Sequence, residues 1–409
     1  KAEEEVNARA EAIKKAEEEV NARAEEVGRI LGMAEIVKPF LRFKAHLSDV
    51  LPKMLRSRMI SVVQGWIPAD RASELQGSLA EAEEKAVRCI VVRFEAPSSE
   101  EEPPTLMENP GVIRPYEFLT RMRGHPSYEE LDPTILSLAI YSIMFGIMFG
   151  DVGQGLALVA VGLIIRRFLR PKKGLAKAIG YMFIPMGISS AVFGLLYGEV
   201  FLVEHVIEPM LFSPLKSIKS MMLLAIYVAF LDLSLGFVIA AINSFKAGDK
   251  FGALLGAHGL GALVFYIGFM LVFKGILDAG MNIMAVFTPW PIAVPIIGLA
   301  MVTATPILKR EGFGRAIGDL LIIVIELLCN TFSFIRLAAF AMAHTCLAIA
   351  AHALTEALGL LGPVMTNGIA MTFELMSCSV QSLRLLYYEF MSKFYHGTGK
   401  PFKPLFERQ

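Results

Sequence analysis

Long apolar segments follow one another from residue 134 onward, whereas the first 130 residues mix charged and apolar positions within every short stretch. A helix needs ~20 residues to cross a bilayer, and the apolar segments lie near or above that length. The pattern predicts a mainly α-helical, polytopic membrane protein with eight transmembrane helices, at residues 134–149, 153–168, 178–202, 221–242, 252–274, 291–308, 319–354 and 363–394. The seventh helix would extend ~54 Å against a hydrocarbon core of ~30 Å, so we expect it and the long eighth helix to tilt strongly.

The composition and the loop charges agree with this topology. Of the 409 residues, 55% are hydrophobic and only 19% are charged, which is unusual for a soluble protein. The even-to-odd loops carry Lys and Arg, and these loops are RRFLRPKKGLAK, NSFKAGDK and LKREGFGR. The opposite loops VEHVIEP, LDAGMN and GLLGPVMTNG hold neither residue. Because cytoplasmic loops are enriched in Lys and Arg, both termini are predicted to be cytoplasmic. The absence of an N-x-[ST] sequon favours a prokaryotic plasma membrane.

The N-terminal region predicts a coiled coil. The decapeptide KAEEEVNARA occurs twice, and Val6, Ile13, Val20 and Val27 recur every seven residues among charged side chains. A heptad with one strong apolar position predicts a thin coiled-coil seam over residues 1–58. An exposed, charged single helix is the alternative interpretation.

A small α/β segment follows the predicted coiled coil. Residues 59–97 predict a strand at 59–67, a helix at 69–85 and a strand at 88–95, which together form the end of a cytoplasmic α/β lobe. A lone βαβ unit cannot cover both faces of its sheet, so we expect further strands from a missing N-terminal segment. The acidic, Pro-rich stretch that follows predicts a linker at 98–130, ahead of a membrane domain at 131–409.

Charged side chains inside the apolar segments are the strongest functional signal, because each costs roughly 2.5–3.5 kcal/mol at membrane depth. Arg336, within FSFIRLAAFAMAH, keeps its charge at any cellular pH. In the same helix, Glu326 precedes it by ~15 Å along the axis and His344 follows it by ~12 Å. In the eighth helix, Glu374 lies ten residues before Arg384.

The predicted orientation places these groups on different sides of the membrane. Glu326 falls on the cytoplasmic side of the first arginine, and His344 and Glu374 fall on the outer side. Titratable groups above and below a fixed cation predict one aqueous access route from each face. A structural ion pair is the alternative for Glu326, and Asp232 and Glu199 are left open between structural and functional roles.

Several motifs resemble one known family. FIRLAAFAMAH and VQSLRLLYYEFMSKFYHGTGKPFKPL resemble the signature helices of subunit a, also called subunit I, of the rotary V-type and A-type ATPases. GWIP, RPYEF and MFGDVGQG resemble further hallmarks of that subunit, and the similarity spans residues 59–409. The resemblance implies a stator with two ion half-channels, which couples the passage of protons or sodium ions to rotation of a proteolipid ring.

The resemblance also implies roles for individual residues. Arg336 corresponds to the arginine that faces the ring, and Arg384 corresponds to its companion. Glu374 and His344 resemble groups of the outer half-channel. Glu326 falls where related chains carry a polar residue in the cytoplasmic half-channel. In the same proton pathway, Gln381 takes a place where some relatives have His, which leaves its role in a relay open.

The implied partners are those of a rotary complex. They are the proteolipid rotor ring, the peripheral stalk subunits through the cytoplasmic domain, the central stalk cap, the catalytic ATPase head and membrane lipid. No nucleic acid, cofactor or metal is expected. Nucleotide hydrolysis by this chain itself is not expected either. HGTGKP lacks the first Gly of a phosphate-binding loop and has Pro in place of Ser or Thr.

Two other functions were weighed. A secondary transporter would use Arg336 and Arg384 to bind an anionic substrate, and it predicts inverted repeats and broken helices. A soluble scaffold with an incidental membrane anchor is the second alternative, and eight spans with charges at depth argue against it.

Overall fold

The computed structural model describes residues 54–56, 61–86, 91–97, 101–169, 175–203, 208–211, 213–279, 289–309, 312–358 and 362–404, with isolated positions 23, 37, 41, 44 and 48. The chain divides into two compact units, Lys1–Glu101 with Phe402–Gln409, and Glu102–Pro401. The predicted coiled coil falls largely outside the described residues, and so do all four apolar positions of its proposed seam.

The first unit contains a short hairpin and one helix. Strand β1 (Leu55–Arg56) pairs antiparallel with β2 (Ser61–Val62), and helix α2 (Ala72–Ala86) follows a 3-10 turn. Helix α2 confirms the helix predicted at 69–85. The βαβ unit is not confirmed, because residues 63–67 and 91–95 lie outside any strand. A two-residue hairpin offers no sheet face for α2 to cover, which explains why the predicted strands do not form a sheet here.

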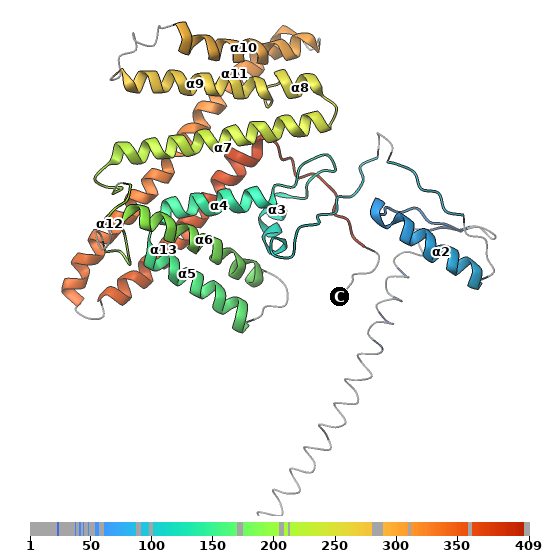
Figure 1. Ribbon diagram of the computed structural model, residues 1–409, viewed down its shortest axis with the longest axis horizontal. Coiled ribbons are helices and arrows are strands. Elements are labelled where there is room, and N and C mark those ends of the chain that lie inside the picture. Colours follow the sequence, from blue (N-terminus) through green and yellow to red (C-terminus); the bar gives the residue numbers. More distant parts are fainter. Residues whose placement is uncertain are drawn as a thin grey trace, which may run out of the picture. The chain divides into compact units, whose positions relative to one another are not determined.

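The second unit is mainly helical. Its helices are α3 (Glu117–Arg123), α4 (Thr134–Phe149), α5 (Val152–Ile164), α6 (Leu175–Tyr197), α7 (Ile218–Lys246), α8 (Lys250–Leu255), α9 (Leu260–Asp278), α10 (Pro289–Leu308), α11 (Phe313–Ser333), α12 (Ile335–Leu358) and α13 (Gly362–Arg384). Helices α7, α9 and α10 lie side by side, whereas α12 and α13 run obliquely across α4 (Figure 1). Helices thus overlap all eight of the predicted apolar segments.

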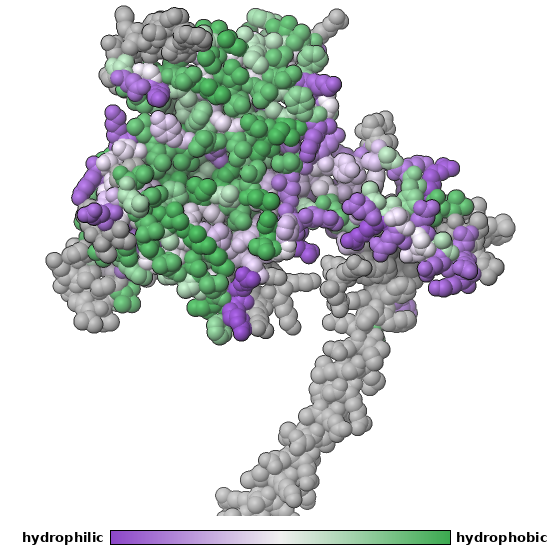
Figure 2. All heavy atoms as spheres, in the orientation of Figure 1, coloured by the Kyte–Doolittle hydropathy of each residue, from purple (hydrophilic) through white to green (hydrophobic). Residues whose placement is uncertain are grey.

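Four of the described helical segments are long and apolar enough to cross a membrane: Ala178–Tyr197, Ile218–Lys246, Lys250–Asp278 and Phe313–Ala351. Thr134–Phe149 and Ile292–Leu308 are shorter apolar helices. Apolar side chains cover most of the visible face of this unit, and polar ones gather along its margins (Figure 2). The described part of the chain therefore has the surface of a membrane protein, in which large apolar side chains face outward as well as inward.

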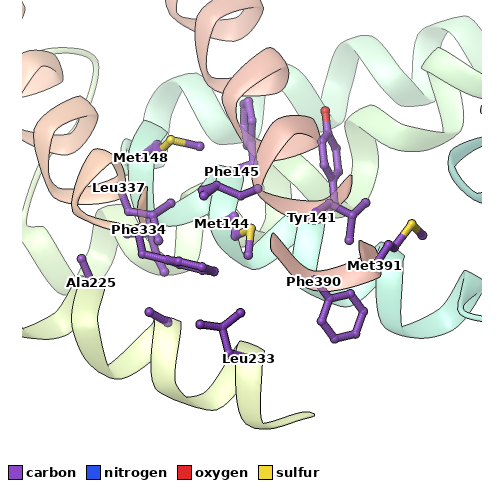
Figure 3. Close-up of a cluster of buried hydrophobic side chains, with 14 of the residues drawn as sticks. Tyr141, Met144, Phe145, Met148, Ala225, Leu233, Phe334, Leu337, Phe390 and Met391 are labelled. Atoms are coloured by element: carbon purple, nitrogen blue, oxygen red, sulfur yellow. The ribbon is translucent and has the colours of Figure 1, made fainter. Parts of the chain in front are cut away.

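Helix α4 lies at the centre of the core. Its buried side chains meet residues from α7, from the start of α12 and from the segment after α13 (Figure 3). These are Tyr141, Met144, Phe145, Met148, Ala225, Leu233, Phe334, Leu337, Phe390 and Met391. The packing therefore fixes the beginning of α12 and the end of α13 against the same helix.

The seventh predicted helix is not continuous. A single turn residue, Phe334, divides it into α11 and α12, within a long apolar helical segment at Phe313–Ala351. Two hydrogen bonds span three residues instead of four at this point, from the Phe334 N–H to the Thr331 carbonyl (3.3 Å) and from the Leu337 N–H to the Phe334 carbonyl (2.8 Å). The Thr331 hydroxyl also donates to the Leu327 carbonyl at 2.7 Å, a bond that bends helices.

The eighth predicted helix changes type beyond Arg384. A π-helical segment runs over Leu385–Phe390 and is followed by a 3-10 turn at Met391–Lys393. A π segment inserts one extra residue per turn, so side chains beyond Arg384 point in directions that a regular α-helix would not give them.

Two loops at one margin of the unit are joined by an ion pair. Lys309 Nζ lies 2.6 Å from Asp249 Oδ2, and this pair connects the end of α10 to the turn between α7 and α8. The hydrogen bond from Lys309, with a second from the Gly252 N–H, lowers the pKa of Asp249. Both loops are among the basic even-to-odd loops, so these two lie on the same side of the unit.

The HGTG stretch near the C-terminus packs closely against residues 124–127. Thr398 forms a parallel bridge with His125, and the Gly399 N–H donates to the His125 carbonyl at 2.9 Å. A Cβ atom on Gly399 would lie only 1.9 Å from the Pro126 carbonyl oxygen. The glycines of this stretch therefore serve a close backbone approach, which accounts for the superficial likeness to a phosphate-binding loop.

Replacing Gly399 by Ala should destabilise this contact by about 1–3 kcal/mol, because the backbone on one side must shift. We expect a lower thermal unfolding temperature for the detergent-solubilised protein. Gly368→Ala is the matched control, since a Cβ there meets nothing within 4 Å and alanine favours the helix. Equal unfolding temperatures for Gly399→Ala and the parent chain would contradict the expectation.

Candidate functional site

His344 in α12 is surrounded by three carboxylates. Its side chain is 3% exposed, and its Nδ1 atom shares a 2.8 Å hydrogen bond with Glu374 Oε2 of α13. On the other side of the ring, Nε2 lies 3.5 Å from Glu199 Oε2 and 3.9 Å from Asp151 Oδ2. Nε2 makes no hydrogen bond to either oxygen. His344 and Glu374, both predicted on the outer side, are thus in contact, and two acidic residues from elsewhere in the chain complete the cluster.

Asp151 is held by the turn between α4 and α5. Gly150 ends α4 in the left-handed conformation, and Asp151 caps α5 by accepting from the Gln154 N–H at 2.8 Å. The N–H groups of Phe201 and Leu202 donate to the same carboxylate at 3.0 and 2.8 Å. Three backbone donors satisfy this fully buried side chain, so Asp151 is a fixed anion close to the histidine.

The segment that supplies these donors is strained. Phe201 and Leu202 both have positive φ values, 51° and 59°, which are uncommon for residues other than glycine. Glu199, two residues earlier, accepts a hydrogen bond from the Thr345 hydroxyl at 3.0 Å. The strain is therefore located where the chain presents two N–H groups to one carboxylate and a second carboxylate to His344.

Arg336 lies in the first turn of α12 and is partly buried. Its Nη2 donates to Ser333 Oγ at 3.3 Å, and that hydroxyl donates to Glu389 Oε1 at 2.5 Å. Arg336 Nη1 and Glu389 Oε2 are both buried without a hydrogen-bond partner among the described residues. The charged neighbours of Arg336 are Glu389 and Arg384. The guanidinium is thus anchored at one nitrogen, while another, buried nitrogen has no hydrogen-bond partner among the described residues.

The other two predicted residues of α13 do not join the histidine cluster. Arg384 is exposed at the end of the helix, and Glu389 is among its charged neighbours. The Gln381 Oε1 atom is buried and accepts no hydrogen bond within the described part of the chain. The two arginines therefore share Glu389 as a neighbour, whereas Gln381 contributes a free acceptor to the same helix.

Glu326 forms an ion pair within the chain. Lys393 Nζ lies 2.5 Å from Glu326 Oε1, and the side chains are 1% and 30% exposed respectively. The ammonium group also lies 5.5 Å from the centre of the Phe237 ring. His258, in the turn between α8 and α9, is a further titratable neighbour of this pair. The contact fits the structural alternative that the sequence left open for Glu326.

Comparison with known proteins places the chain in a family. Residues 2–214, just over half of the chain, match the family model of the V-type ATPase 116kDa subunit. The chain belongs to this family. It is 28% identical to the A-type ATP synthase subunit I of Methanocaldococcus jannaschii, over 84% of this chain and 54% of that protein. It is also 28% identical to the A-type ATP synthase subunit I of Thermococcus kodakarensis, over 87% of this chain and 56% of that protein.

A bacterial relative is similar over a shorter range. The V-type ATP synthase subunit I 2 of Treponema pallidum is 33% identical over 37% of this chain and 34% of that protein. The chain spans about half the length of the archaeal relatives it matches most broadly. The resemblance that the motifs indicated is confirmed. Both archaeal and bacterial proteins are similar to this member of the family.

Sequence reasoning missed three residues of the site, Glu389, Lys393 and Asp151, and left the role of Glu199 open. Glu389 and Lys393 both lie within the quoted VQSLRLLYYEFMSKF stretch, and both are buried charged residues. Asp151 lies in the MFGDVGQG turn, where a lone acidic residue at the start of an apolar helix was an available signal. Among the described residues, no group of three or more His, Cys, Asp or Glu side chains is arranged to hold a metal ion.

The Glu326–Lys393 pair allows a test of its structural contribution. Glu326→Gln should destabilise the protein by on the order of 2–3 kcal/mol, because it leaves a buried ammonium without a counter-charge. The double variant with Lys393→Met should recover most of this loss. Thermal unfolding of the detergent-solubilised protein measures both.

The control is Glu102→Gln, whose partner Lys400 is 68% exposed, so a loss under ~0.5 kcal/mol is expected. A double variant as unstable as Glu326→Gln alone would contradict the pairing.

Proposed function

We propose that this chain is the membrane-embedded stator subunit of a rotary V-type or A-type ATPase or ATP synthase. In this proposal Arg336 is the fixed cation that faces the carboxylates of a rotating proteolipid ring, and Arg384 is its companion. The observation that carries the proposal is the buried Nη1 atom of Arg336, which has no hydrogen-bond partner among the described residues, in a permanent charge anchored at one side only. Because an unpaired buried charge is costly, a carboxylate from outside the chain is the natural partner.

The proposed architecture has eight transmembrane helices in a membrane domain at 131–409. A linker at 98–130, a cytoplasmic α/β lobe ending at 59–97 and a coiled-coil arm at 1–58 precede it. The contact between Lys309 and Asp249 supports the proposed orientation, since it joins two basic loops at one margin. In Figure 1 the turn between α7 and α8 lies opposite the ends of α12 and α13 that face each other. We place the first margin, with both termini, on the cytoplasmic side of a prokaryotic plasma membrane.

The outer half-channel is proposed to contain the His344 cluster. A buried imidazole with a carboxylate at 2.8 Å on one nitrogen and further carboxylates near the other can pass a proton across the ring. Asp151 supplies a constant negative charge that favours a cation at this place. Gln381, with its unsatisfied oxygen, is proposed to hold a water molecule of the same path.

The cytoplasmic half-channel is proposed to begin near Glu326. This carboxylate is the more exposed member of its pair with Lys393, so it can exchange protons with water while the ammonium stays buried. The pairing supports a route in which Lys393 holds Glu326 in place and Glu326 guides the ion toward Arg336.

The mechanism follows from the chemistry of arginine. A ring carboxylate that faces lipid must be neutral, because burying its charge is costly. Beside Arg336 the ionised form is favoured, so the proton is released there. Arginine does not deprotonate in proteins, so no proton passes through it from one half-channel to the other. Ion transfer, of protons or of sodium, then requires the ring to turn.

The proposed partners follow from this role. They are the proteolipid ring, the peripheral stalk subunits at the cytoplasmic lobe, the central stalk cap, the catalytic head and membrane lipid. The chain itself is not proposed to hydrolyse nucleotide, and no nucleic acid, cofactor or metal has a place in the mechanism.

Arg336→Ala in the intact complex should abolish ATP-driven proton pumping. Arg336→Lys should abolish it as well, because an ammonium lacks the planar fork and has a different reach. Pumping is measured by quenching of a pH-sensitive dye in reconstituted vesicles, and ATP hydrolysis by the detached head serves as the control. Pumping by Arg336→Ala at the parent rate would sink the stator assignment.

Glu374→Gln should lower the transport rate or shift its pH optimum, because it removes the carboxylate hydrogen-bonded to His344. The pH profile of pumping in the same vesicles measures the effect. Glu102→Gln, an exposed carboxylate, is expected to leave the profile unchanged. An unchanged profile for Glu374→Gln would count against a channel role.

An anion transporter remains the second candidate, because the interruption between α11 and α12 beside Arg336 is a feature that this alternative predicts. The two proposals differ in what the chain needs. Uptake of an anionic solute by the chain reconstituted without a ring would favour the transporter, whereas copurification with a proteolipid ring would favour the stator.

A further inference from the structure

The environment of Arg336 contains a buried carboxylate that none of the predicted roles uses. Building on the stator function proposed above, we propose that Glu389 is the positioning residue of Arg336. Through the Ser333 hydroxyl it holds one edge of the guanidinium, and the other edge, which has no acceptor among the described residues, is left to the carboxylate of a rotor subunit.

The hydrogen bonds define a direction through Ser333. The hydroxyl donates its one proton to Glu389 Oε1 at 2.5 Å and accepts from Arg336 Nη2 at 3.3 Å. A distance of ~2.5–2.7 Å is typical of a hydroxyl that donates to a charged oxygen. Ser333 therefore uses its donor on the anion and its lone pair on the cation, the arrangement in which each bond strengthens the other.

Local structure brings the three residues together. Ser333 is the last residue of α11 and Arg336 is in the first turn of α12, so they are three residues apart and lie on one face. Glu389 follows Arg384 by five residues. In an α-helix that spacing would separate the two side chains by ~140° around the axis, whereas the wider turns of the π segment reduce this angle. The π segment is thus what turns Glu389 toward the arginines.

The two arginines share one carboxylate among the described residues. Arg336 and Arg384 are permanent cations, and Glu389 is the carboxylate that both have as a neighbour. Glu389 also has Lys393 and the buried Asp232 as neighbours, so it is not reserved for the arginines. The Nη1 atom of Arg336, unpartnered in the described part of the chain, provides the donor for a second carboxylate.

Glu389 also limits how tightly an incoming carboxylate can bind. Glu389, which is linked to the guanidinium through Ser333, partly offsets the positive charge of Arg336. The ion pair between Arg336 and a rotor carboxylate is therefore weaker and shorter-lived. Without that competition the rotor carboxylate would stay on Arg336 longer, and each rotational step would slow. Positioning and release thus depend on the same two hydrogen bonds.

The test uses single substitutions in the intact complex. Glu389→Gln keeps the shape of the side chain and removes its charge, and Ser333→Ala removes the bridge. Each should lower the maximal rate of ATP-driven proton pumping roughly 3- to 10-fold, the effect of losing one hydrogen bond. The ratio of protons moved to ATP hydrolysed should not change, because Arg336 still blocks the leak.

Two further variants separate positioning from a packing role. Ser333→Thr keeps the hydroxyl and should retain the parent rate, which a mere change of volume would not predict. The double variant Ser333→Ala with Glu389→Gln should be no slower than the slower single variant, since both break one chain of contacts. Rates that multiply in the double variant, or equal rates for Ser333→Ala and Ser333→Thr, would overturn the proposal.

The outcomes distinguish this inference from the function on which it rests. If Arg336→Ala still pumps, the stator assignment fails first. If Arg336→Ala abolishes pumping while Glu389→Gln and Ser333→Ala pump at the parent rate, only the positioning role fails. Retention of the ring on purification reports assembly. Should Glu389→Gln fail to assemble, the comparison of Ser333→Ala with Ser333→Thr decides the question alone.

Discussion

The cost of leaving a charge without a partner in an apolar helix bundle governs the arrangement of this chain. Some of the buried charged groups meet that cost with partners from this chain. Lys393 lies against Glu326 and an aromatic ring, and Asp151 accepts three backbone N–H groups. Among the described residues, Arg336 Nη1, Glu389 Oε2 and both carboxylate oxygens of Asp232 are buried without a hydrogen-bond partner. The unpartnered nitrogen of Arg336 is the one that the proposed stator role assigns to a charge from another molecule.

Irregularities in the helices determine which charged groups have partners and which do not. The interruption at Phe334 separates α11 from α12 just before the arginine, and the π segment after Arg384 re-aims Glu389. Two consecutive residues with positive φ, Phe201 and Leu202, turn their N–H groups to Asp151. Regular helices would bury the same residues without bringing these groups together. Hydrophobic packing around α4 holds the helices in place, and the irregular turns bring the charged and polar groups into contact.

The sequence predicted the helices better than the contacts between them. Apolar periodicity located a helix in all eight segments, because burial and lipid exposure both demand long apolar runs. His344 and Glu374 lie in contact, but the roles that the family resemblance implied for them stay predictions. Extrapolating an α-helical period could not place Glu389, since the helix changes type between it and Arg384. Asp151 is far from His344 in the sequence, and only the tertiary packing brings the two side chains to 3.9 Å from each other.

The two ion-pair environments explain why the cation in the first turn of α12 and the cation in the 3-10 turn beyond α13 have different roles. Lys393 has a carboxylate at 2.5 Å, so its charge is neutralised within the chain and it stabilises the packing of α11 against the end of α13. Arg336 reaches its carboxylate only through a hydroxyl, which leaves part of its field unscreened in a low-dielectric setting. A direct pair would have made Arg336 a structural residue. Interposing Ser333 keeps the guanidinium in place and still attractive to a carboxylate that arrives and departs.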